Sequence, residues 1–415
     1  MLFQLHEPGS FRICATPECE HEAVNFIEAL SQSVPDALGS AQPLGIILTG
    51  SLSRGEGTLT RDGDGKVRWL SDVECLVVFE DDCSISREIR AALENAAQGL
   101  TDRSRAQATG LKIQLSAIRA SSIATMRPSI FKCELLQHGK LIWTRPLGVL
   151  LTCDPDTDAT IPRQDALRLL SNRIMELIPP RLKLADKAQD NDPAYALNKF
   201  WLDAGTSLSV FLNCYQPNYA ERSRAVGNCL ISNCHSLNLR TAHYVARKVC
   251  EATNVKLGRA PVGLDVTERD FVDAAGVGAD LWYWQTDQLL SLAPRFDAPD
   301  WREIAPRLRR LQTTRQRIRD WSRLAVRTKG IRVPGLSGVW QILRAGSFGS
   351  AIYAAGCLLQ FFWDEVASGQ KRGVTIAQSL GNVLGVNGES STAGRRQLAE
   401  RTFRYWEYHL RDSSL

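Results

Sequence analysis

The sequence predicts an α+β fold, in which a mixed β-sheet domain is followed by an all-α region. Short apolar and β-branched segments typical of strands are concentrated in the first 150 or so residues, where they alternate with helical patterns. Beyond about residue 155 these strand patterns fade, and apolar residues recur at helical spacing. A chain of 415 residues is also too long for one ordinary compact core, so more than one domain is expected.

The predicted sheet domain contains strands and helices in alternation. The expected elements are a helix over 21–34, a buried strand over 44–48, a strand over 72–79, a helix over 86–98 and a strand over 111–118. Turn chemistry at Asp62-Gly63-Asp64-Gly65 predicts a hairpin over 58–70, inserted between the first two strands.

The predicted helical region starts with two well-marked helices. Pro162 fits the first turn of one helix, and Asp192-Pro193 fits the cap and first position of a second helix that extends to about Leu212. Further helical patterns lie near 240–252, 268–292, 301–327, 348–366 and 393–411, with breaks at Pro179-Pro180 and Pro334-Gly335. We expect a sheet domain over 1–155, a helical domain over 156–330 on the acceptor side, and a helical segment over 331–415 packed on the preceding helices.

Composition indicates a globular protein of the cytoplasm. Hydrophobic residues make up 44% and charged residues 23%, and the net charge of +5 permits an anionic ligand without singling out nucleic acid. The N-terminus has no basic flank followed by an apolar stretch, and the eleven cysteines are scattered as in proteins of a reducing compartment. The most apolar segment, 347–363, is short for a membrane span, so we expect a buried helix there and no membrane association.

The first stretch with chemical meaning is Gly50-Ser51, which directly follows the apolar strand. Glycine allows the backbone to approach a phosphate closely, and backbone amides at a helix start point toward an anion. Ser51 and Ser53 add hydroxyl donors, and Arg54 adds a guanidinium fork that suits phosphate oxygens. The stretch is therefore a candidate nucleotide-phosphate site.

The second stretch is Asp72-Val73-Glu74, at the start of the next long strand. Asp72 and Glu74 are two residues apart, so both side chains project from the same face of a strand. Two neighbouring carboxylates repel each other unless a cation neutralises them, and oxygen-rich sites suit Mg²⁺ or Mn²⁺. An otherwise apolar strand seldom carries two carboxylates without such a partner.

The apolar strand, Gly50-Ser51 and the Asp72-x-Glu74 strand together resemble the DNA-polymerase-β-like nucleotidyltransferase superfamily. The Gly-Ser-x-x-Arg-Gly-Glu and Ser-Asp-x-Glu forms look like the bacterial minimal and aminoglycoside nucleotidyltransferases, over about residues 20–150. The resemblance implies that Gly50 and Ser51 bind the triphosphate of an NTP, with ATP as the expected nucleotide, and that Asp72 and Glu74 bind the metal ions. It further implies transfer of a nucleoside monophosphate to an acceptor hydroxyl with release of pyrophosphate.

The chain departs from that family at the position of a third carboxylate. The matching strand over 111–118 carries Gln114, and an amide cannot accept a proton. Three explanations stay open: the base comes from elsewhere, the acceptor is intrinsically reactive, or catalysis is impaired. Glu134 is one candidate replacement, although an ordinary helical acid is the alternative interpretation. The gap between Gly-Ser and the acids is also longer than usual, which the hairpin over 58–70 would explain.

The helix after Pro193 offers two further candidates. Tyr195, Lys199 and Asp203 are spaced by four residues and form a polar stripe. In the superfamily a helical lysine beyond the sheet often reaches the triphosphate, which makes Lys199 a candidate phosphate ligand and Asp203 a candidate base. The alternative is an exposed ion pair between Lys199 and Asp203.

Basic residues are dense over 302–329, with few acids among them. This stretch is either a solvated amphipathic helix or a surface for RNA or another polyanion.

Taken with the resemblance, these features predict a metal-dependent nucleotidyltransferase. Its two rivals are a catalytically weak nucleotide-binding or regulatory protein, which Gln114 favours, and an RNA-directed nucleotidyltransferase that uses the basic stretch.

Overall fold

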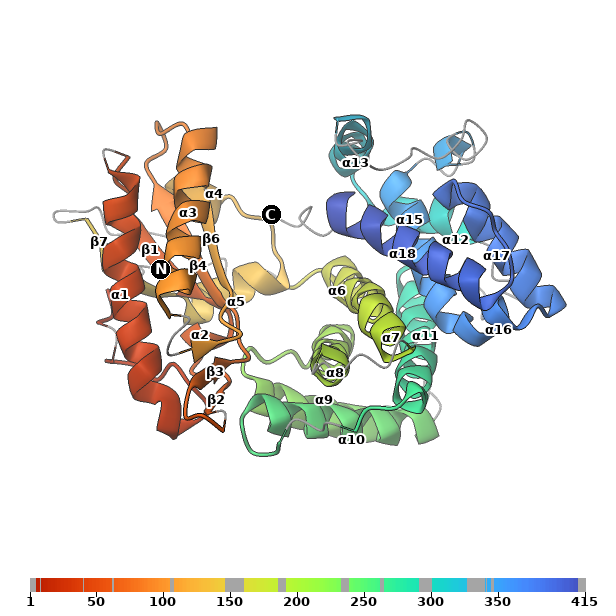
Figure 1. The fold of residues 1–415 in the computed structure, drawn as a ribbon, viewed down its shortest axis with the longest axis horizontal. Helices are drawn as coiled ribbons and strands as arrows, with labels where there is room; N and C mark the ends of the chain where they lie inside the picture. Colours follow the sequence, from red (N-terminus) through yellow and green to blue (C-terminus); the bar gives the residue numbers. More distant parts are fainter. Residues whose placement is uncertain are drawn as a thin grey trace. The chain divides into compact units, whose positions relative to one another are not determined.

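The computed structural model divides the chain into two compact units (Figure 1). It describes residues 5–7, 9–39, 41–61, 63–104, 108–145, 160–185, 192–232, 239–261, 265–290, 301–326, 340, 342–344 and 347–409. We call the first unit the sheet unit; it comprises Met1–Pro162, Tyr215–Ala225 and Cys250–Pro261. We call the second the helical unit; it comprises Arg163–Cys214, Val226–Val249 and Val262–Leu415.

Strands are found in the first part of the sheet unit, among short helices. The strands are β1 (Gly45–Thr49), β2 (Leu59–Arg61), β3 (Val67–Trp69), β4 (Val73–Phe79), β5 (Ala108–Thr109), β6 (Ile113–Arg119) and β7 (Lys140–Thr144). The helices among them are η1 (Pro17–Cys19), α1 (Glu20–Leu38), α2 (Gly50–Ser53), α3 (Arg87–Ser104), α4 (Ala120–Ala124) and α5 (Ile130–His138).

Beyond Pro162 the described residues form helices and their connections. These helices are α6 (Arg163–Glu176), α7 (Ile178–Ala185), α8 (Asp192–Phe211), α9 (Tyr219–Ser232), α10 (Leu239–Lys256), α11 (Glu268–Leu290), α12 (Trp301–Leu308), η2 (Arg309–Leu311), α13 (Thr314–Val326), α15 (Phe348–Phe361), α16 (Trp363–Ser368), α17 (Lys371–Leu384) and α18 (Thr392–His409). The α+β class predicted from the sequence is confirmed.

The main sheet is mixed and has the strand order β6-β4-β1-β7. β1 runs antiparallel to both of its neighbours, whereas β4 and β6 are parallel. In this register Glu74 of β4 is paired with Thr49 at the end of β1 and with Gln114 at the start of β6. The end of β1 and the starts of β4 and β6 therefore meet at one end of the sheet.

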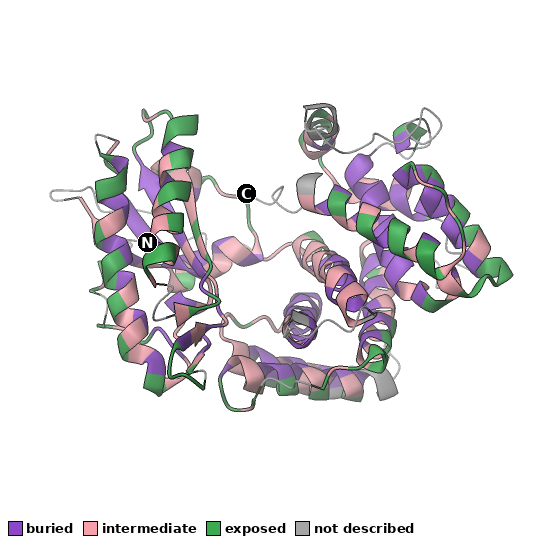
Figure 2. Cartoon of the chain, viewed as in Figure 1, coloured by how far each residue is buried: buried purple, intermediate pink, exposed green. Residues whose placement is uncertain are grey.

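Each face of the main sheet has its own hydrophobic core, and buried positions run along both β1 and β4 (Figure 2). Alternate residues of β4, such as Val73 and Cys75, face a core that includes α1 and α3. Leu76 and Val78 face the opposite core, to which α5 contributes Leu135. We refer to these as the α1/α3 face and the α5 face. Because strand side chains alternate, every residue of β4 can be assigned to one of them.

The predicted hairpin over 58–70 is present as β2 and β3, with Leu59 paired with Trp69. It leaves β1 and β4 adjacent, as expected. Its strands are nevertheless part of the core, because Leu59, Val67 and Trp69 are buried with α1. The Trp69 and Phe26 rings meet edge to face with their centroids 5.1 Å apart. Only the exposed tip at 63–66 thus has the character of a surface excursion.

Some of the helical patterns are divided in the structure. The pattern over 301–327 forms α12, η2 and α13, because the chain is extended at Gln312. The pattern over 348–366 forms α15 and α16. Pro179 and Pro180 lie in the first turn of α7, where the missing backbone N–H groups cost little. The break therefore falls between the end of α6 and the start of α7. The break expected at Pro334-Gly335 lies outside the described residues.

In the helical unit, the C-terminal helices pack against the earlier ones. Asn172 of α6 accepts hydrogen bonds from Tyr353 of α15 at 2.6 Å and from Trp406 of α18 at 3.1 Å. Buried Trp282 of α11 donates to Ser171 of α6 at 3.0 Å. These bonds satisfy the polar ends of large aromatic side chains inside an apolar core.

In the described part of the chain, no helix is both long enough and apolar enough for a membrane span.

The packing of the hairpin against α1 leads to a stability prediction. Trp69→Ala should lower the free energy of unfolding by about 3–5 kcal/mol, since it removes a buried aromatic side chain and leaves a cavity. Urea denaturation followed by circular dichroism measures the change. Asp64→Ala at the exposed tip of the same hairpin is the control and should have an effect within about 0.5 kcal/mol. Equal stabilities for the two variants would show that the hairpin is not part of the core.

Candidate functional site

The turn that follows β1 requires glycine at position 50. Gly50 has φ +68°, a backbone conformation that residues with a side chain rarely adopt. A Cβ added there would lie 2.6 Å from Oε2 of Glu74. The carboxylate of Glu74 therefore lies directly against the backbone of the Gly-Ser turn. This close approach joins the two sequence stretches that were singled out as a phosphate site and a metal site.

The structure places Asp72 immediately before β4 and Glu74 within it, and both are half-buried. The residues between and after them, Val73 and Cys75, are buried in the core of the α1/α3 face. By alternation Glu74 lies on the α5 face, with Leu76 and Val78, and Asp72 directly precedes the strand. Two partly solvated carboxylates two residues apart, with Glu74 against a turn without a side chain, supply oxygen donors of the kind that fits a hard divalent cation.

Gln114 is paired with Glu74 in the β4–β6 register and is exposed. Its neighbours Ile113 and Leu115 pack on the core of the α1/α3 face, so Gln114 projects on the α5 face beside Glu74. The position at which the family resemblance implies a third carboxylate therefore carries an amide oxygen. An amide can coordinate a cation weakly but cannot take up a proton.

Lys256 supplies a positive charge at this site that the sequence analysis did not identify. Its Nζ donates hydrogen bonds to Oγ of Ser71 at 2.6 Å and to Oγ of Ser51 at 3.3 Å. Its own carbonyl accepts from Oγ1 of Thr58 at 2.5 Å, which fixes the backbone at the end of α10. The sheet unit thus brings a lysine to the serine of the Gly-Ser turn from 205 residues away.

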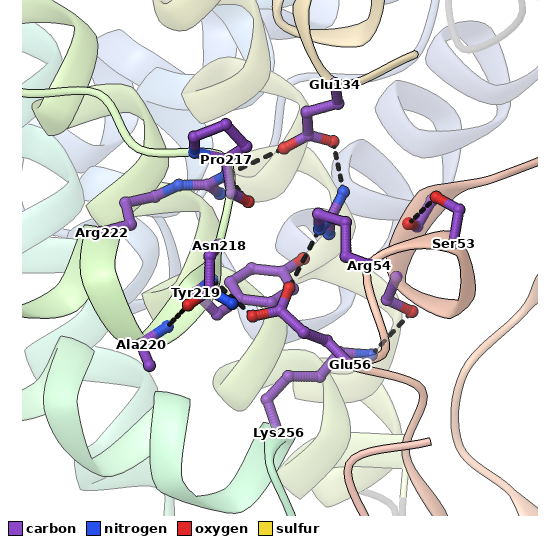
Figure 3. Close-up of polar contacts among 12 residues, drawn as sticks. Ser53, Arg54, Glu56, Glu134, Pro217, Asn218, Tyr219, Ala220, Arg222 and Lys256 are labelled. Atoms are coloured by element: carbon purple, nitrogen blue, oxygen red, sulfur yellow. Dashed lines mark hydrogen bonds and ion pairs between the residues drawn. The ribbon is translucent and has the colours of Figure 1, made fainter. Parts of the chain in front are cut away.

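Arg54 follows the turn and is paired with two carboxylates, of buried Glu56 and half-buried Glu134 (Figure 3). Its Nε donates to Glu56 at 2.9 Å and its Nη1 donates to Glu134 at 2.7 Å. Side chains of Arg54 and Glu56 are each only 3% exposed. The phosphate role that the sequence suggested for Arg54 would require breaking these buried ion pairs, so its contacts instead indicate a structural role.

The same network includes the segment 215–225, which belongs to the sheet unit. Glu134 Oε1 accepts hydrogen bonds from Tyr215 at 2.7 Å and from Arg222 at 2.8 Å. Glu56 Oε1 accepts from the backbone N–H of Tyr219 at 2.7 Å. Figure 3 shows Arg54 lying between Glu134 and Glu56, with Tyr219 alongside. We call Arg54, Glu56, Glu134, Tyr215 and Arg222 the buried ion network.

Charges in the buried ion network stabilise one another. Burial raises the pKa of a carboxyl group, but Arg54 and Arg222 outweigh this effect and hold the pKa of Glu134 below its usual value. Burial likewise lowers the pKa of a guanidinium, and Glu134, Tyr219 and Glu56 reverse this effect at Arg54. A carboxylate held in its ionised form is a weak proton acceptor. The base role considered for Glu134 is therefore disfavoured by its surroundings.

The remaining candidates each have contacts of their own. Ser53 is buried and donates to the carbonyl of Gly50 at 2.9 Å, which closes the turn. Lys199 and Asp203 lie on α8 in the helical unit. Asp203 is buried and ion-paired with Arg173 of α6, and Lys199 lies over the ring of Tyr195 at 5.9 Å. Asp203 is thus paired with an arginine, whereas the alternative interpretation of the sequence paired it with Lys199.

The basic stretch is distributed over three short elements of the helical unit. Arg302, Arg310 and Arg315 are exposed, whereas Asp320 is buried and accepts from Gln312 at 3.3 Å. Arg327 and Lys329 lie outside the described residues.

Within the described ranges, no group of three or more His, Cys, Asp or Glu side chains is gathered around a metal-sized position. Asp72 and Glu74 remain the candidate pair for Mg²⁺ or Mn²⁺.

The buried ion network leads to a second stability prediction. Arg54→Met should lower the free energy of unfolding by about 3–5 kcal/mol, because it leaves Glu56 and Glu134 buried with one cation fewer. Arg90→Met on the exposed side of α3 is the matched control and should change stability by less than about 0.5 kcal/mol. Both values come from urea denaturation. A loss at Arg54 no larger than at Arg90 would contradict the structural role of the network.

Comparison with known proteins identifies no relative. No family model matches the chain, and no curated protein and no solved structure matches it. The case for a function therefore depends on the residues of the sheet unit and their geometry.

Proposed function

We propose that the sheet unit is a metal-dependent nucleotidyltransferase that uses an NTP, with ATP as the expected nucleotide. It would move the nucleoside monophosphate to an acceptor hydroxyl and release pyrophosphate. The observation that carries the proposal is the approach of the Glu74 carboxylate to the Gly50 backbone, next to Ser51 and Lys256. Groups that suit a cation and groups that suit a phosphate chain meet there at one end of the sheet.

Asp72 and Glu74 would hold the divalent ion. When bound, Mg²⁺ would neutralise charge on the phosphates and on the leaving oxygen. The two carboxylates would position this charge next to the Gly-Ser turn. Both are half-buried, so they are partly shielded from water and still accessible from solvent. This partial exposure suits a site that must exchange nucleotide.

Ser51 and Lys256 would bind the phosphates. The Ser51 hydroxyl can donate to a phosphate oxygen, and the Lys256 ammonium, which donates to Ser51 and Ser71, brings a positive charge to the same place. Gly50 contributes a backbone with no side chain in the way. α2 spans four residues, so its dipole adds little, and Lys256 is the main source of positive charge in this proposal.

A second candidate function is nucleotide binding with little or no transfer. Gln114 favours it, because the side chain beside Glu74 can neither ionise nor accept a proton. Both functions predict binding of Mg²⁺ and NTP. They differ in whether pyrophosphate is released, which a coupled assay with ATP and Mg²⁺ measures directly.

Replacing one metal-binding carboxylate tests the metal site. Asp72→Asn should abolish transfer and leave the melting temperature of the apo protein unchanged or slightly raised, because it relieves repulsion from Glu74. Mg²⁺ with ATP should raise the melting temperature of the wild type and not that of the variant. Thermal unfolding of both proteins, with and without Mg²⁺ and ATP, gives the comparison.

The matched control is Asp82→Asn, an exposed acid of the same unit. It should retain the full ligand-induced stabilisation. If Asp72→Asn gains as much stability from Mg²⁺ and ATP as the wild type does, Asp72 is not a metal ligand.

Lys256→Met tests the phosphate site. The variant keeps most of the aliphatic side chain and loses the charge, so the Kd for Mg²⁺·ATP should rise about 10–100-fold, as expected for a charged hydrogen bond of about 1.5–3 kcal/mol. Isothermal titration calorimetry measures the Kd. Lys66→Met at the exposed hairpin tip removes the same charge and should leave the Kd within about twofold. An unchanged Kd in Lys256→Met would remove Lys256 from the site.

A further inference from the structure

The last residue of α5, His138, lies at the end of the sheet that carries the candidate site. α5 packs on the α5 face through Leu135, the face that also carries Glu74 and Gln114. Gly139 connects His138 directly to β7, whose first residue, Lys140, is paired with Leu48 near the end of β1. The C-terminus of α5 is therefore held beside the Gly50 turn. His138 is half-buried, so its ring remains accessible.

Four charged groups act electrostatically on His138. They are Arg54 after α2, Glu134 one turn earlier on α5, Lys140 of β7 and Glu221 of α9. Burial, followed by the positive charge of Arg54, lowers the pKa of His138 below 6.5, and the two glutamates only partly oppose this effect. Among the described residues, none is hydrogen-bonded to the His138 ring. At neutral pH the imidazole is uncharged and has a lone pair available.

The nearby carboxylates do not offer an equivalent group. Glu134 accepts from Arg54, Tyr215 and Arg222, and Glu56 accepts from Arg54 and Tyr219. Glu134 is held as an anion by Arg54 and Arg222, and buried Glu56 is ion-paired with Arg54, so proton uptake by either would break an ion pair. Asp72 and Glu74 are the proposed metal ligands, and Gln114 is not basic. Of the described side chains compared here, His138 is the one that is neutral and able to accept a proton.

We propose that His138 is the proton acceptor of this site, in place of the carboxylate that Gln114 replaces. The inference rests on the proposed function. As the acceptor oxygen forms its bond to the α-phosphorus, its proton moves to a ring nitrogen of His138, and the bond from the α-phosphorus to the bridging oxygen breaks. Pyrophosphate leaves with that electron pair, and the imidazolium returns its proton to water. The charge on the protein is then restored.

The first test follows His138 directly by NMR in the full-length chain. With ¹⁵N-labelled histidine, the His138 ring signals are assigned by their loss in His138→Gln. The midpoint of its titration should lie below 6.5 and should move when Mg²⁺ and α,β-methylene-ATP are added, because the bound phosphates change the local charge. The signals of exposed His21 and His243 are the controls and should not move.

The outcomes separate this inference from the function on which it rests. If the ligand raises the melting temperature and the His138 titration is unchanged, the nucleotide site exists and His138 is not part of it. If the ligand changes neither, the nucleotide site itself is wrong and the inference fails with it. Movement of the His138 midpoint together with a higher melting temperature supports both.

The second test uses water as the acceptor and measures release of AMP from α-³²P-labelled ATP with Mg²⁺. In the wild type the rate should fall as the pH drops through the His138 pKa. His138→Gln should be about 100-fold slower or more, lack this acidic limb, and keep the ligand-induced rise in melting temperature. His21→Gln should behave as the wild type. A pH profile with the same acidic limb in His138→Gln would overturn the assignment.

Discussion

The buried guanidinium of Arg54 is the charge on which the candidate site depends. Removing an ion from water costs several kcal/mol, and Arg54 recovers this only because Glu56 and Glu134 are both in contact with it. Glu134 in turn needs Arg222 and Tyr215 to satisfy its second oxygen. Two cations and two anions give a neutral group, so the network can be buried as a whole. Because Arg54 directly follows the Gly50–Ser53 turn, the same bonds fix the position of Ser51 and the approach of Glu74 to Gly50.

Much of the fold could be predicted because the signals are local. The apolar run at 44–48, the turn chemistry at 62–65 and the capped helix start at Asp192-Pro193 each identify one element without reference to the rest of the chain. β7 was not predicted, because its five residues show no clear alternation and gain their stability from β1. The division of the 301–327 pattern was missed for a similar reason. Helical periodicity persists across Gln312 although the backbone there is extended.

The candidate site could be predicted only in part, because the sequence shows local patterns and does not show which distant segments come into contact. Gly50, Ser51, Asp72 and Glu74 lie within 25 residues of one another along a strand-turn-strand pattern, and strand alternation alone indicates that the two acids share a face. Lys256 and His138 have no such local pattern. Lys256 is the last residue of a helix, and only tertiary packing shows that the helix ends at Ser51 and Ser71. Lys199 was suggested by residue type and rough position, and its role stays a prediction, because those two criteria do not distinguish one helical lysine from another.

The order of segments in the sheet unit has a consequence for synthesis of the chain. The unit is completed by Tyr215–Ala225 and Cys250–Pro261, which a ribosome adds long after the last strand of the main sheet. Until then Glu134 lacks Arg222, and Ser51 lacks Lys256. The nascent sheet therefore lacks two of these contacts of the candidate site while the intervening helices of the helical unit are still being made. Domains ordinarily fold as successive units from the N-terminus. Here the sheet unit begins first and is completed only by segments that follow α6, α7 and α8, so its candidate site is incomplete in the partly made chain.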